Sequence, residues 1–247
     1  MLLSLITATY NSAATLADTL TSVREQSYPQ IEHLIVDGLS SDSTLAILRQ
    51  FPHARLVVSE RDSGIYDAMN KGIRAAKGEV IGLLNSDDVY INNDVVRKVM
   101  TCFQDPAIDA VYGDLQFVAA DNLHRVVRTW RAGTYRRNKL YWGWMPPHPT
   151  FFVRKQLYEQ WGLFTTQLKS AADYELILRF LLKANSQLFY IPEVLVKMRV
   201  GGASNASLHS RMQAHWEDYR AWKINGLTPY PWTVVCKPLR KISQYFS

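Results

Sequence analysis

Apolar runs of strand length alternate with helical segments through the first half of this chain, and this alternation limits the fold more than any other feature. The predicted strands lie at 2–8, 33–38, 54–60 and 79–84. The predicted helices between them cover about 11–26, 42–51 and 65–78. Continuous apolar runs are expected of strands that are buried on both faces of a sheet. The pattern therefore predicts an α/β fold with a mainly parallel sheet flanked by helices.

The second half of the chain is less regular. Its predicted elements are a helix at 95–103, an extended segment at 109–118, an amphipathic helix at 170–183 and one or two strands at 187–200. Beyond about residue 205, a helical segment leads into a basic and aromatic C-terminus. No internal repeat or low-complexity linker divides the 247 residues. The sequence therefore predicts one domain at 1–204 with a helical C-terminal extension at 205–247.

A cluster of polar residues follows each of the four predicted strands of the first half. The clusters read TYN, DGLSSD, ERDSG and NSDD, in chain order. In open parallel sheets, ligands bind just beyond the carboxyl ends of the strands. Four polar strand ends therefore predict one crevice that binds a polar ligand.

The cluster Asn85-Ser86-Asp87-Asp88 places two adjacent carboxylates just past a buried strand. Mg²⁺ and Mn²⁺ bind carboxylate oxygens and often complete their coordination with substrate phosphates. The same residues also fit a strand-to-helix turn in which Asp or Asn caps a helix that begins near Asn92. The loop alone leaves metal binding and helix capping open.

The other strand ends offer further ligand-binding side chains. Asp37 ends an apolar strand and can accept hydrogen bonds from a base or from ribose hydroxyls, whereas Asp42 is better explained as a helix cap. Arg61 is a candidate for binding phosphate. Asp67 and Lys71 are four residues apart, which fits a helix-surface ion pair as well as it fits substrate contact.

The second half contributes one candidate general base. Asp173 lies in the first turn of a predicted helix, where it either stabilises the helix end or removes a proton from an incoming hydroxyl. His148 lies in a Pro-rich loop and is a candidate for binding metal, phosphate or acceptor, although a histidine in such a loop is more often structural. Arg199 is a second candidate for contacting acceptor or phosphate. Glu175 and Arg179 have the spacing of a structural ion pair.

The net charge of +6 hides an asymmetry between the two halves. Residues 1–121 carry 9 Lys and Arg against 16 Asp and Glu, and residues 122–247 carry 19 against 6, which gives net charges of −7 and +13. The basic residues match no nucleic-acid-binding motif, so no nucleic-acid partner is predicted. The C-terminus combines aromatic with basic residues: Trp232, Lys237, Arg240, Lys241, Tyr245 and Phe246. This combination fits an anionic membrane surface or, alternatively, a packed helix with a solvated basic face.

The location of the protein is predicted from what the sequence lacks. It has no secretory signal and no run approaching the ~20 apolar residues of a transmembrane helix. Cys102 and Cys236 form no disulfide framework, which favours a reducing compartment. We therefore expect a cytoplasmic protein, either free or peripheral at the inner face of the cytoplasmic membrane. The sequence makes no prediction of the oligomeric state.

Several segments, in chain order, resemble the inverting family 2 glycosyltransferases of the GT-A fold, a type common in bacterial surface-polysaccharide synthesis. These segments are SLITATYNSAATL, VDGLSSDST, SERDSGIYDAMNKGIRAAKGEVIGLLNSDDVY, HPTFFVRK, GLF and AADYELILRF. The resemblance covers about residues 1–200 and is most specific over 59–90. It implies a nucleotide-sugar donor, most often a UDP-sugar, and a divalent metal, Mn²⁺ or Mg²⁺. It also implies a glycan or lipid-linked glycan as acceptor, as in lipopolysaccharide or capsule synthesis.

The resemblance also implies a role for individual residues. The residues implied to bind the donor or its nucleotide are Thr7, Tyr10, Asn11, Asp37, Arg61, Asp67, Lys71 and Asp87. The family's DxD-type motif corresponds to NSDD, so Asp87 would contact ribose or metal and Asp88 would coordinate the metal, while Asn85 stands where the family has its first Asp. Asp173 corresponds to the catalytic base. On this basis, residues 1–118 form a donor-binding half and residues 119–204 an acceptor and catalytic-base half.

Two other classes of protein compete with this interpretation. A sugar nucleotidyltransferase shares the α/β architecture and metal use, but TYNSAAT lacks the Gly-rich basic phosphate loop of such enzymes. A non-catalytic nucleotide- or glycan-binding module is disfavoured because the chain has both Asp88 and Asp173. No GxxxxGK[ST], GxGxxG, GxSxG or HExxH motif supports a P-loop kinase, a dinucleotide dehydrogenase, an α/β hydrolase or a zincin.

Overall fold

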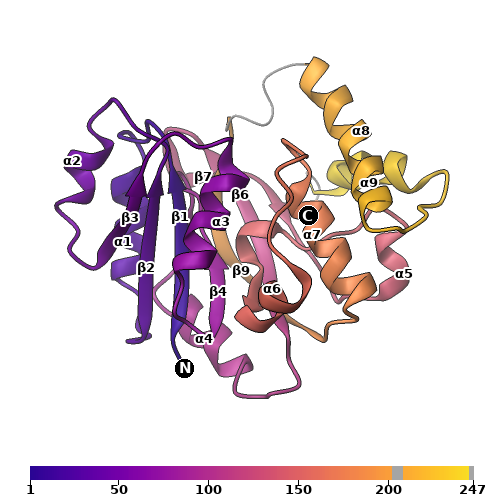
Figure 1. The fold of residues 1–247 in the computed structure, drawn as a ribbon, viewed down its shortest axis with the longest axis horizontal. Coiled ribbons are helices and arrows are strands. Elements are labelled where there is room, and N and C mark those ends of the chain that lie inside the picture. Colours follow the sequence, from indigo (N-terminus) through magenta and orange to yellow (C-terminus); the bar gives the residue numbers. More distant parts are fainter. Residues whose placement is uncertain (202–207, 245–247) are drawn as a thin grey trace.

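A nine-stranded mixed sheet runs through the described residues in the order β3-β2-β1-β4-β8-β6-β9-β5, and β7 pairs with β6 (Figure 1). The structure is a computed structural model that describes residues 1–201 and 208–244, with backbone alone at 208–212 and 241–243. Tyr245 and Phe246 of the predicted basic and aromatic C-terminus lie outside the described residues.

The first half forms the parallel part of the sheet. Its strands are β1 (Leu3–Thr9), β2 (Ile31–Asp37), β3 (Ala54–Ser59) and β4 (Val80–Leu83), and neighbouring strands in the order β3-β2-β1-β4 pair in parallel. The helices between them are α1 (Leu16–Arg24), α2 (Thr44–Leu48) and α3 (Ile65–Ala75). The predicted alternation is confirmed here, although each helix is shorter than its predicted range.

Beyond β4 the sheet is mixed rather than parallel. β6 (Ala110–Ala119) runs parallel to β9 (Leu188–Arg199) but antiparallel to β7 (Asn122–Trp130) and β8 (Phe152–Arg154). β5 (Val89–Tyr90) is antiparallel to β9. A tight hairpin joins β6 to β7, and a hairpin can join only antiparallel strands. The remaining helices are α4 (Val95–Cys102), α5 (Arg137–Leu140), a 3₁₀ turn at His148–Thr150, α6 (Lys155–Trp161), α7 (Ala172–Leu178) with a π-helical turn at Arg179–Lys183, α8 (Leu208–Ile224) and α9 (Thr233–Ser243).

Both faces of the parallel strands are covered by helices. Alternate residues of β1 point to opposite faces, so Leu5 belongs to the hydrophobic cluster that includes residues of α4, while Ile6 belongs to the cluster that includes residues of α3 and α7. Each such fully buried aliphatic side chain contributes about 1.5–3 kcal/mol of hydrophobic stabilisation. Gly72 lets α3 approach β1 closely, because a Cβ there would lie 2.4 Å from Cγ2 of Ile6. This approach sets the position of α3, whose first turns face the carboxyl ends of the strands.

The C-terminal helices share the core of the preceding residues. Trp222 on α8 is fully buried, and its indole N–H donates to the Tyr174 hydroxyl over 3.0 Å. Asn225 donates to the Glu175 carbonyl oxygen, also over 3.0 Å. The predicted domain boundary at 204/205 falls outside the described residues, and the boundary at 118/119 falls at the end of β6. Those boundaries remain predictions.

Candidate active site

The loops that follow β1, β2, β3 and β4 are joined to one another by hydrogen bonds. Asn11 Oδ1 accepts from the Ser41 backbone N–H over 2.9 Å, which connects the first two loops. The hydroxyls of Ser12 and Ser86 lie 2.8 Å apart and connect the loops after β1 and β4. The Ser59 hydroxyl, at the end of β3, donates to Asp37 over 2.6 Å. The four polar strand ends therefore meet at one edge of the sheet, as the sequence predicts.

Asp37 and Thr7 are turned toward the protein rather than toward solvent. Both residues are fully buried. The Asp37 carboxylate accepts hydrogen bonds from Ser59 Oγ and from both the backbone N–H and the hydroxyl of Ser40. Thr7 Oγ1 lies 3.0 Å from Nε2 of His33. Asp37 therefore orders the loop around it, and Thr7 offers the crevice no free hydroxyl.

Tyr10 and Asn11 lie at the open edge of the same loops. Tyr10 is 64% exposed, and its side chain lies against Gly38 together with Asp62. A Cβ at Gly38 would lie 2.7 Å from Oδ2 of Asp62, so a side chain there would require the Asp62 carboxylate to shift. Asn11 has a positive φ of 46°, a conformation that Asn tolerates better than most residues. An exposed aromatic ring beside an ordered polar loop can stack on a planar ligand group.

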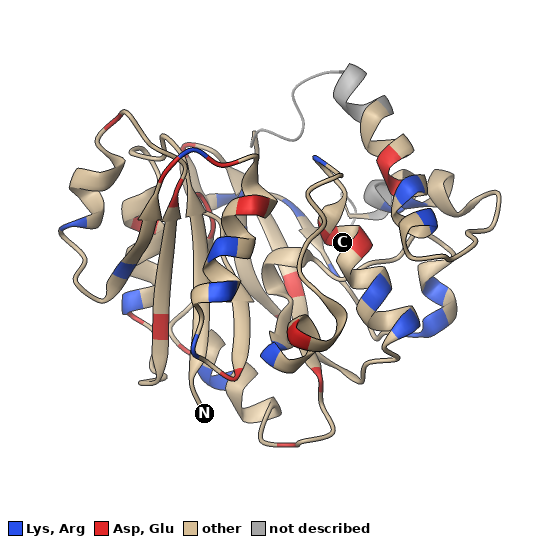
Figure 2. Cartoon of the chain, viewed as in Figure 1, with Lys and Arg blue, Asp and Glu red and all other residues tan. Residues whose placement is uncertain are grey.

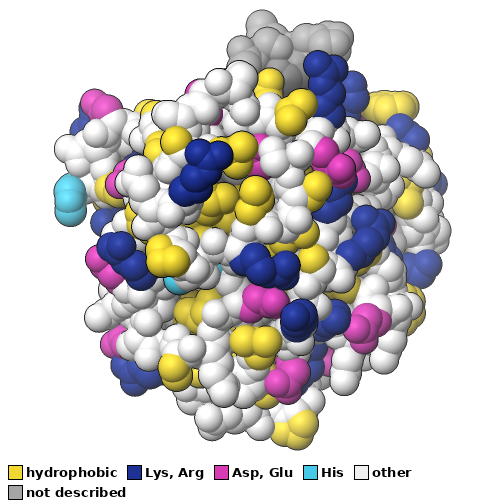
Figure 3. Space-filling view, turned by 60° about the vertical axis from the view of Figure 1, so that its left-hand side comes forward, with side chains coloured by type: hydrophobic (Ala, Val, Ile, Leu, Met, Phe, Trp, Pro, Cys, Tyr) yellow, Lys and Arg dark blue, Asp and Glu magenta, His cyan; other side chains and the backbone are white. Residues whose placement is uncertain are grey.

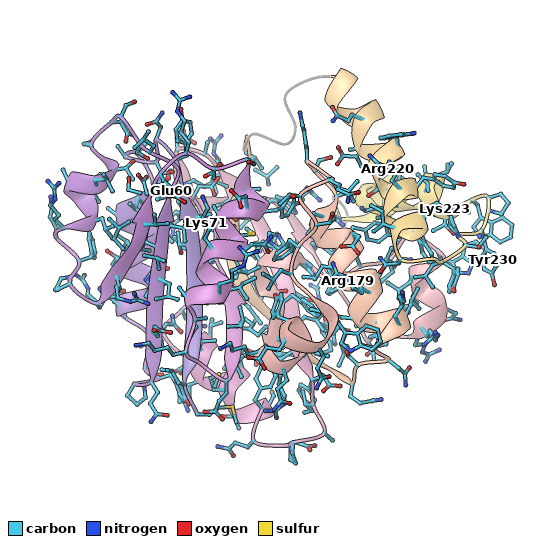
Figure 4. The ribbon with its side chains drawn as sticks, viewed as in Figure 1. Glu60, Lys71, Arg179, Arg220, Lys223 and Tyr230 are labelled. Carbon is cyan, nitrogen blue, oxygen red and sulfur yellow. The ribbon has the colours of Figure 1, made fainter. Side chains whose placement is uncertain are left out.

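The predicted ion pair between Asp67 and Lys71 is present, and it includes a third residue. Lys71 Nζ lies 2.9 Å from Oε1 of Glu60 and 3.4 Å from Oδ2 of Asp67. Figure 4 labels Glu60 and Lys71 at the top of the sheet, where β3 ends. The hydrogen bond that Lys71 donates to Glu60 makes the largest contribution that raises the pKa of Lys71, so this amine is positively charged. Arg61 is exposed beside this group.

The two aspartates of the NSDD turn have different surroundings. Asp88 is fully buried, and its Oδ2 accepts from the Asn85 amide over 2.9 Å. Oδ1 of Asp88 and Oδ1 of Asn85 are buried without a hydrogen-bond partner. Asp87 is only partly buried. Burial raises the pKa of both carboxyls, and the neighbouring charge of Asp87 raises that of Asp88 further, to well above its usual range.

Arg199 holds the backbone of this turn. Its guanidinium donates to the Asp87 carbonyl oxygen over 2.7 Å and to Oδ2 of Asp18, on α1, over 2.5 Å. It also donates to the Ala120 carbonyl oxygen over 3.2 Å, and the residue is only 8% exposed. Arg199 therefore lies next to the acidic turn, but most of its donors are already bonded within the protein. Its predicted contact with acceptor or phosphate remains a prediction.

The NSDD turn fits a hard divalent cation. Two carboxylates side by side repel each other, and the buried oxygens without partners lack the hydrogen bonds that such groups normally make. A cation that binds oxygen would offset the repulsion between the carboxylates and would give the buried oxygens a partner. Within residues 1–201 and 208–244, no cluster of three or more His, Cys, Asp or Glu side chains has the arrangement of a metal site. A cation at this turn would therefore need further oxygen ligands from a bound substrate.

Asp173, at the start of α7, is joined to Tyr66 on α3 by a hydrogen bond. The Tyr66 hydroxyl, in the first turn of α3, donates to Oδ1 of Asp173 over 3.2 Å. The same oxygen accepts from the backbone N–H of Tyr174 over 2.8 Å. His148 is close enough for the Asp173 charge to favour its protonation, but burial has the larger effect and lowers the pKa of His148. Its Nε2 is buried without a partner.

Tyr66 and Glu60 are the residues of this site that sequence reasoning did not single out. Tyr66 lies within the polar segment SERDSGIYDAMNKG, but an aromatic residue at a helix start is equally typical of a core residue. Only the packing of α3 against α7 distinguishes the two cases. Burial, and then the Asp173 charge, raise the pKa of Tyr66 well above 10, so its hydroxyl remains a hydrogen-bond donor.

Comparison with known sequences decides the family. Residues 4–162 match the family model described as "Glycosyl transferase family 2". The chain belongs to this family. This family 2 glycosyltransferase is 33% identical over 184 residues to an uncharacterized glycosyltransferase of Mycobacterium tuberculosis, covering 71% of this chain and 67% of the relative. It is 31% identical over 182 residues to a PGL/p-HBAD biosynthesis glycosyltransferase of the same species, covering 71% and 68%.

Solved structures show that the enzyme has the GT-A fold. S. aureus TarS 1–349 in complex with UDP-GlcNAc superposes with a TM-score of 0.70 at 21% identity, covering 91% of this chain and 65% of that one. The mannosyltransferase PcManGT of Pyrobaculum calidifontis, in complex with GDP-Man and Mn²⁺, gives a TM-score of 0.63 at 18% identity, covering 98% and 74%. The chain spans 43% of a longer TarS structure.

Proposed function

We propose that this family 2 glycosyltransferase transfers one sugar, with inversion, from a nucleotide-diphosphate sugar to a hydroxyl of a glycan or lipid-linked glycan. The observation that carries the proposal is the presence of two separate acidic groups: the NSDD turn, in which Asn85 is bonded to Asp88, and the Asp173 carboxylate, which is bonded to Tyr66. A single displacement needs at least two groups: an acidic turn whose metal binds the diphosphate, and a separate carboxylate that accepts the proton. A double displacement would need a second carboxylate close to the anomeric carbon.

The donor half of the crevice suits a nucleotide. Tyr10 offers an exposed ring for a base, Asp37 orders the loop beneath it, and Arg61 and Lys71 carry positive charge toward a diphosphate. A UDP-sugar is our first choice of donor, since the structural neighbour TarS binds UDP-GlcNAc. PcManGT is described with GDP-Man and Mn²⁺, which makes a GDP-sugar the alternative to test.

Asp87 and Asp88 would hold the divalent metal. Asp87 is the more accessible of the two, and Asp88 contributes an unpartnered Oδ1 behind it. A bound Mn²⁺ or Mg²⁺ would offset the charge that develops on the leaving diphosphate. Asn85 and Arg199 hold the turn in place through the contacts described above.

Asp173 would act as the general base. As the acceptor oxygen forms its bond to the anomeric carbon, the bond to the diphosphate oxygen breaks and the acceptor proton passes to the Asp173 carboxylate. Tyr66 orients that carboxylate through Oδ1, which leaves Oδ2 for the acceptor hydroxyl. His148 lies near the same oxygen atoms and would contact the acceptor.

The acceptor in this proposal belongs to surface-polysaccharide synthesis, such as that of lipopolysaccharide or capsule. A membrane-borne glycan would bring the enzyme to the inner face of the cytoplasmic membrane as a peripheral protein. Among the described residues, no helix combines the length and apolar character that crossing a bilayer requires.

Donor binding and hydrolysis test the proposal directly. Thermal-shift measurements with UDP, GDP and their sugars, with and without Mn²⁺, should show stabilisation by one nucleotide family that is stronger with the metal. Asp173→Asn should lower kcat by about 10²–10⁴-fold while leaving donor binding intact. The exposed Asp121→Asn serves as the matched control.

Three results would contradict this assignment. Pyrophosphate release from a nucleoside triphosphate and a sugar phosphate would indicate a nucleotidyltransferase. Nucleotide-sugar binding with neither hydrolysis nor transfer would indicate a binding module. Full activity of Asp173→Asn would exclude this residue as the base.

A further inference from the structure

Three large aromatic side chains form an exposed cluster where the C-terminal extension meets the rest of the protein. Trp142 follows α5, and its ring centroid lies 5.5 Å from that of Trp232. Tyr230 lies 5.1 Å from the same ring of Trp232. The three residues are 43–51% exposed although they contact one another. Aromatic rings that remain so exposed usually mark a surface that binds something else.

Helix α9 extends this cluster with an apolar face that points outward. Trp232, Val235 and Leu239 are spaced by three and four residues, so they lie on one side of the helix, and Val235 and Leu239 are 59% and 57% exposed. We call Trp142, Tyr230, Trp232, Val235 and Leu239 the outer aromatic surface.

The opposite side of α9 is held to the protein by polar contacts. Lys237 Nζ lies 2.5 Å from Oδ1 of Asp218 on α8 and 3.8 Å from the centroid of the Tyr174 ring. Thr233 is fully buried and donates to the Tyr141 carbonyl oxygen over 2.7 Å. Lys237 was expected on a membrane-facing segment, but it faces inward. The helix therefore presents its apolar side to the exterior and a charged residue to the interior, the reverse of an ordinary surface helix.

The backbone of α9 lies close to the backbone at Gly143. Gly143, with φ +72°, lies so near α9 that a Cβ would be 2.4 Å from the backbone N of Lys237. The outward direction of Val235 and Leu239 is therefore fixed by the fold.

Positive charge borders the outer aromatic surface. The charges of Arg136 and Arg240 both act on Lys139, so these three cations lie near one another and near Trp142, three residues after Lys139. On α8, Arg220 lies 4.7 Å from the ring centroid of the exposed Trp216. Figure 2 shows blue residues on α5 and both blue and red residues on α8, and Figure 4 labels Arg220, Lys223 and Tyr230 at this end of the molecule. The face in Figure 3, turned toward the donor half, instead mixes both signs of charge.

We propose that the outer aromatic surface docks this enzyme on an anionic lipid leaflet, with Trp142, Tyr230 and Trp232 at the headgroup level and the bordering cations on the lipid phosphates. The inference rests on the proposed function, because a lipid-linked acceptor is what gives such a contact its use. A second copy of the chain fits the surface less well, since an isologous contact would bring the basic half with its net charge of +13 against itself. An anionic surface complements that charge.

The test is co-sedimentation with vesicles and intrinsic tryptophan fluorescence, using the full chain. Vesicles of phosphatidylcholine with phosphatidylglycerol should bind the protein and shift its emission to shorter wavelength. Pure phosphatidylcholine vesicles or added salt should weaken that binding. The double variant Trp142→Ser/Trp232→Ser should bind about tenfold more weakly or worse. Both tryptophans are about half exposed, so the variant should keep its melting temperature within a few degrees and its donor hydrolysis rate.

Two control variants change a tryptophan or a charge outside the outer aromatic surface. Trp161→Ala removes a partly exposed tryptophan on α6, and Arg125→Glu reverses an exposed charge on β7. Neither should change vesicle binding by more than about twofold.

The proposal is overturned if the protein binds no vesicle, or if the double variant binds as well as the parent. It is also overturned if sedimentation velocity shows a dimer that the double variant dissolves, because the surface then belongs to a second copy. Donor binding is measured separately in solution. Vesicle binding without nucleotide-sugar binding would therefore reject the proposed function while leaving the docking surface in place.

Discussion

At the scale of single residues, the site depends on side chains that orient other side chains. Asp173 is oriented by Tyr66, and the Asp37 carboxylate is used to order its own loop. A sequence shows which residues can carry charge, so Asp37, Asp87, Asp88 and Asp173 could be singled out as candidates. It does not show which carboxylates will be enclosed, and that difference separates the buried Asp88 from the more accessible Asp87.

Tyr66→Phe should slow transfer without weakening donor binding. The substitution removes only the hydroxyl that donates to Asp173 over 3.2 Å and keeps the ring stacked on Phe164. Loss of one orienting hydrogen bond should lower kcat by about 5- to 20-fold, far less than loss of the proposed base, Asp173. Steady-state kinetics would show this as a change in kcat with an unchanged donor KM. A raised donor KM with the parental kcat would place Tyr66 in donor binding instead.

His33 should make the stability of the protein depend on pH. Burial, and then the charge of His53, lower the pKa of His33 to about 3, whereas an unfolded histidine has a pKa of 6.5. Between these values the unfolded chain binds the extra proton, so stability should fall as the pH drops below about 6.5, by up to about 1.4 kcal/mol per pH unit. Urea unfolding at pH 7.5 and pH 5 measures this slope. His33→Gln should flatten it, whereas the exposed His124→Gln should leave it unchanged.

At the scale of elements, helix α7 is fixed by a buried ion pair. Arg179 donates to the Glu175 carboxylate and to the carbonyl oxygens of Trp161 and Leu163, which tie α7 to the end of α6. The spacing of the pair was evident in the sequence, and its structural role is confirmed. The burial of the pair was not evident in the sequence, because it depends on contacts with the segment around Trp161 and Leu163, which is distant in sequence.

Glu175→Ala should destabilise the protein by about 3–5 kcal/mol, since it leaves the Arg179 charge buried without its partner. Glu159→Ala breaks an ion pair of the same spacing with Lys155, but Glu159 is 59% exposed, so the expected cost is below about 1 kcal/mol. Urea midpoints of the two variants provide the comparison. Equal losses would show that the burial of Glu175 has no energetic consequence.

The parallel elements were predictable, and several antiparallel ones were not. β1 to β4 are continuous apolar runs that end in polar clusters, and both signals are local in the sequence. β7 is mostly exposed, so it has no apolar pattern, and β5 has only two residues. Their pairing with β6 and β9 depends on contacts that no short stretch of sequence encodes.

At the scale of the whole molecule, the C-terminal extension and α7 form one hydrophobic core. Trp222, Tyr174 and Ala221 are buried in the cluster that also contains Ile6 of β1. Tryptophan fluorescence, far-UV circular dichroism and calorimetry should therefore report one coincident transition. Trp222→Ala should shift all three together and cost about 3–5 kcal/mol. A separate early transition in the parent would show that the extension unfolds on its own.

The contact between Gly143 and α9 has a consequence for how this enzyme can diversify. That contact joins backbone to backbone, so it does not depend on which side chains α9 turns outward. Substitutions at Val235 or Leu239 can therefore accumulate without moving the helix or altering the candidate active site. Descendants of this chain are free to change the surface they attach to while they keep the reaction, provided that position 143 remains glycine.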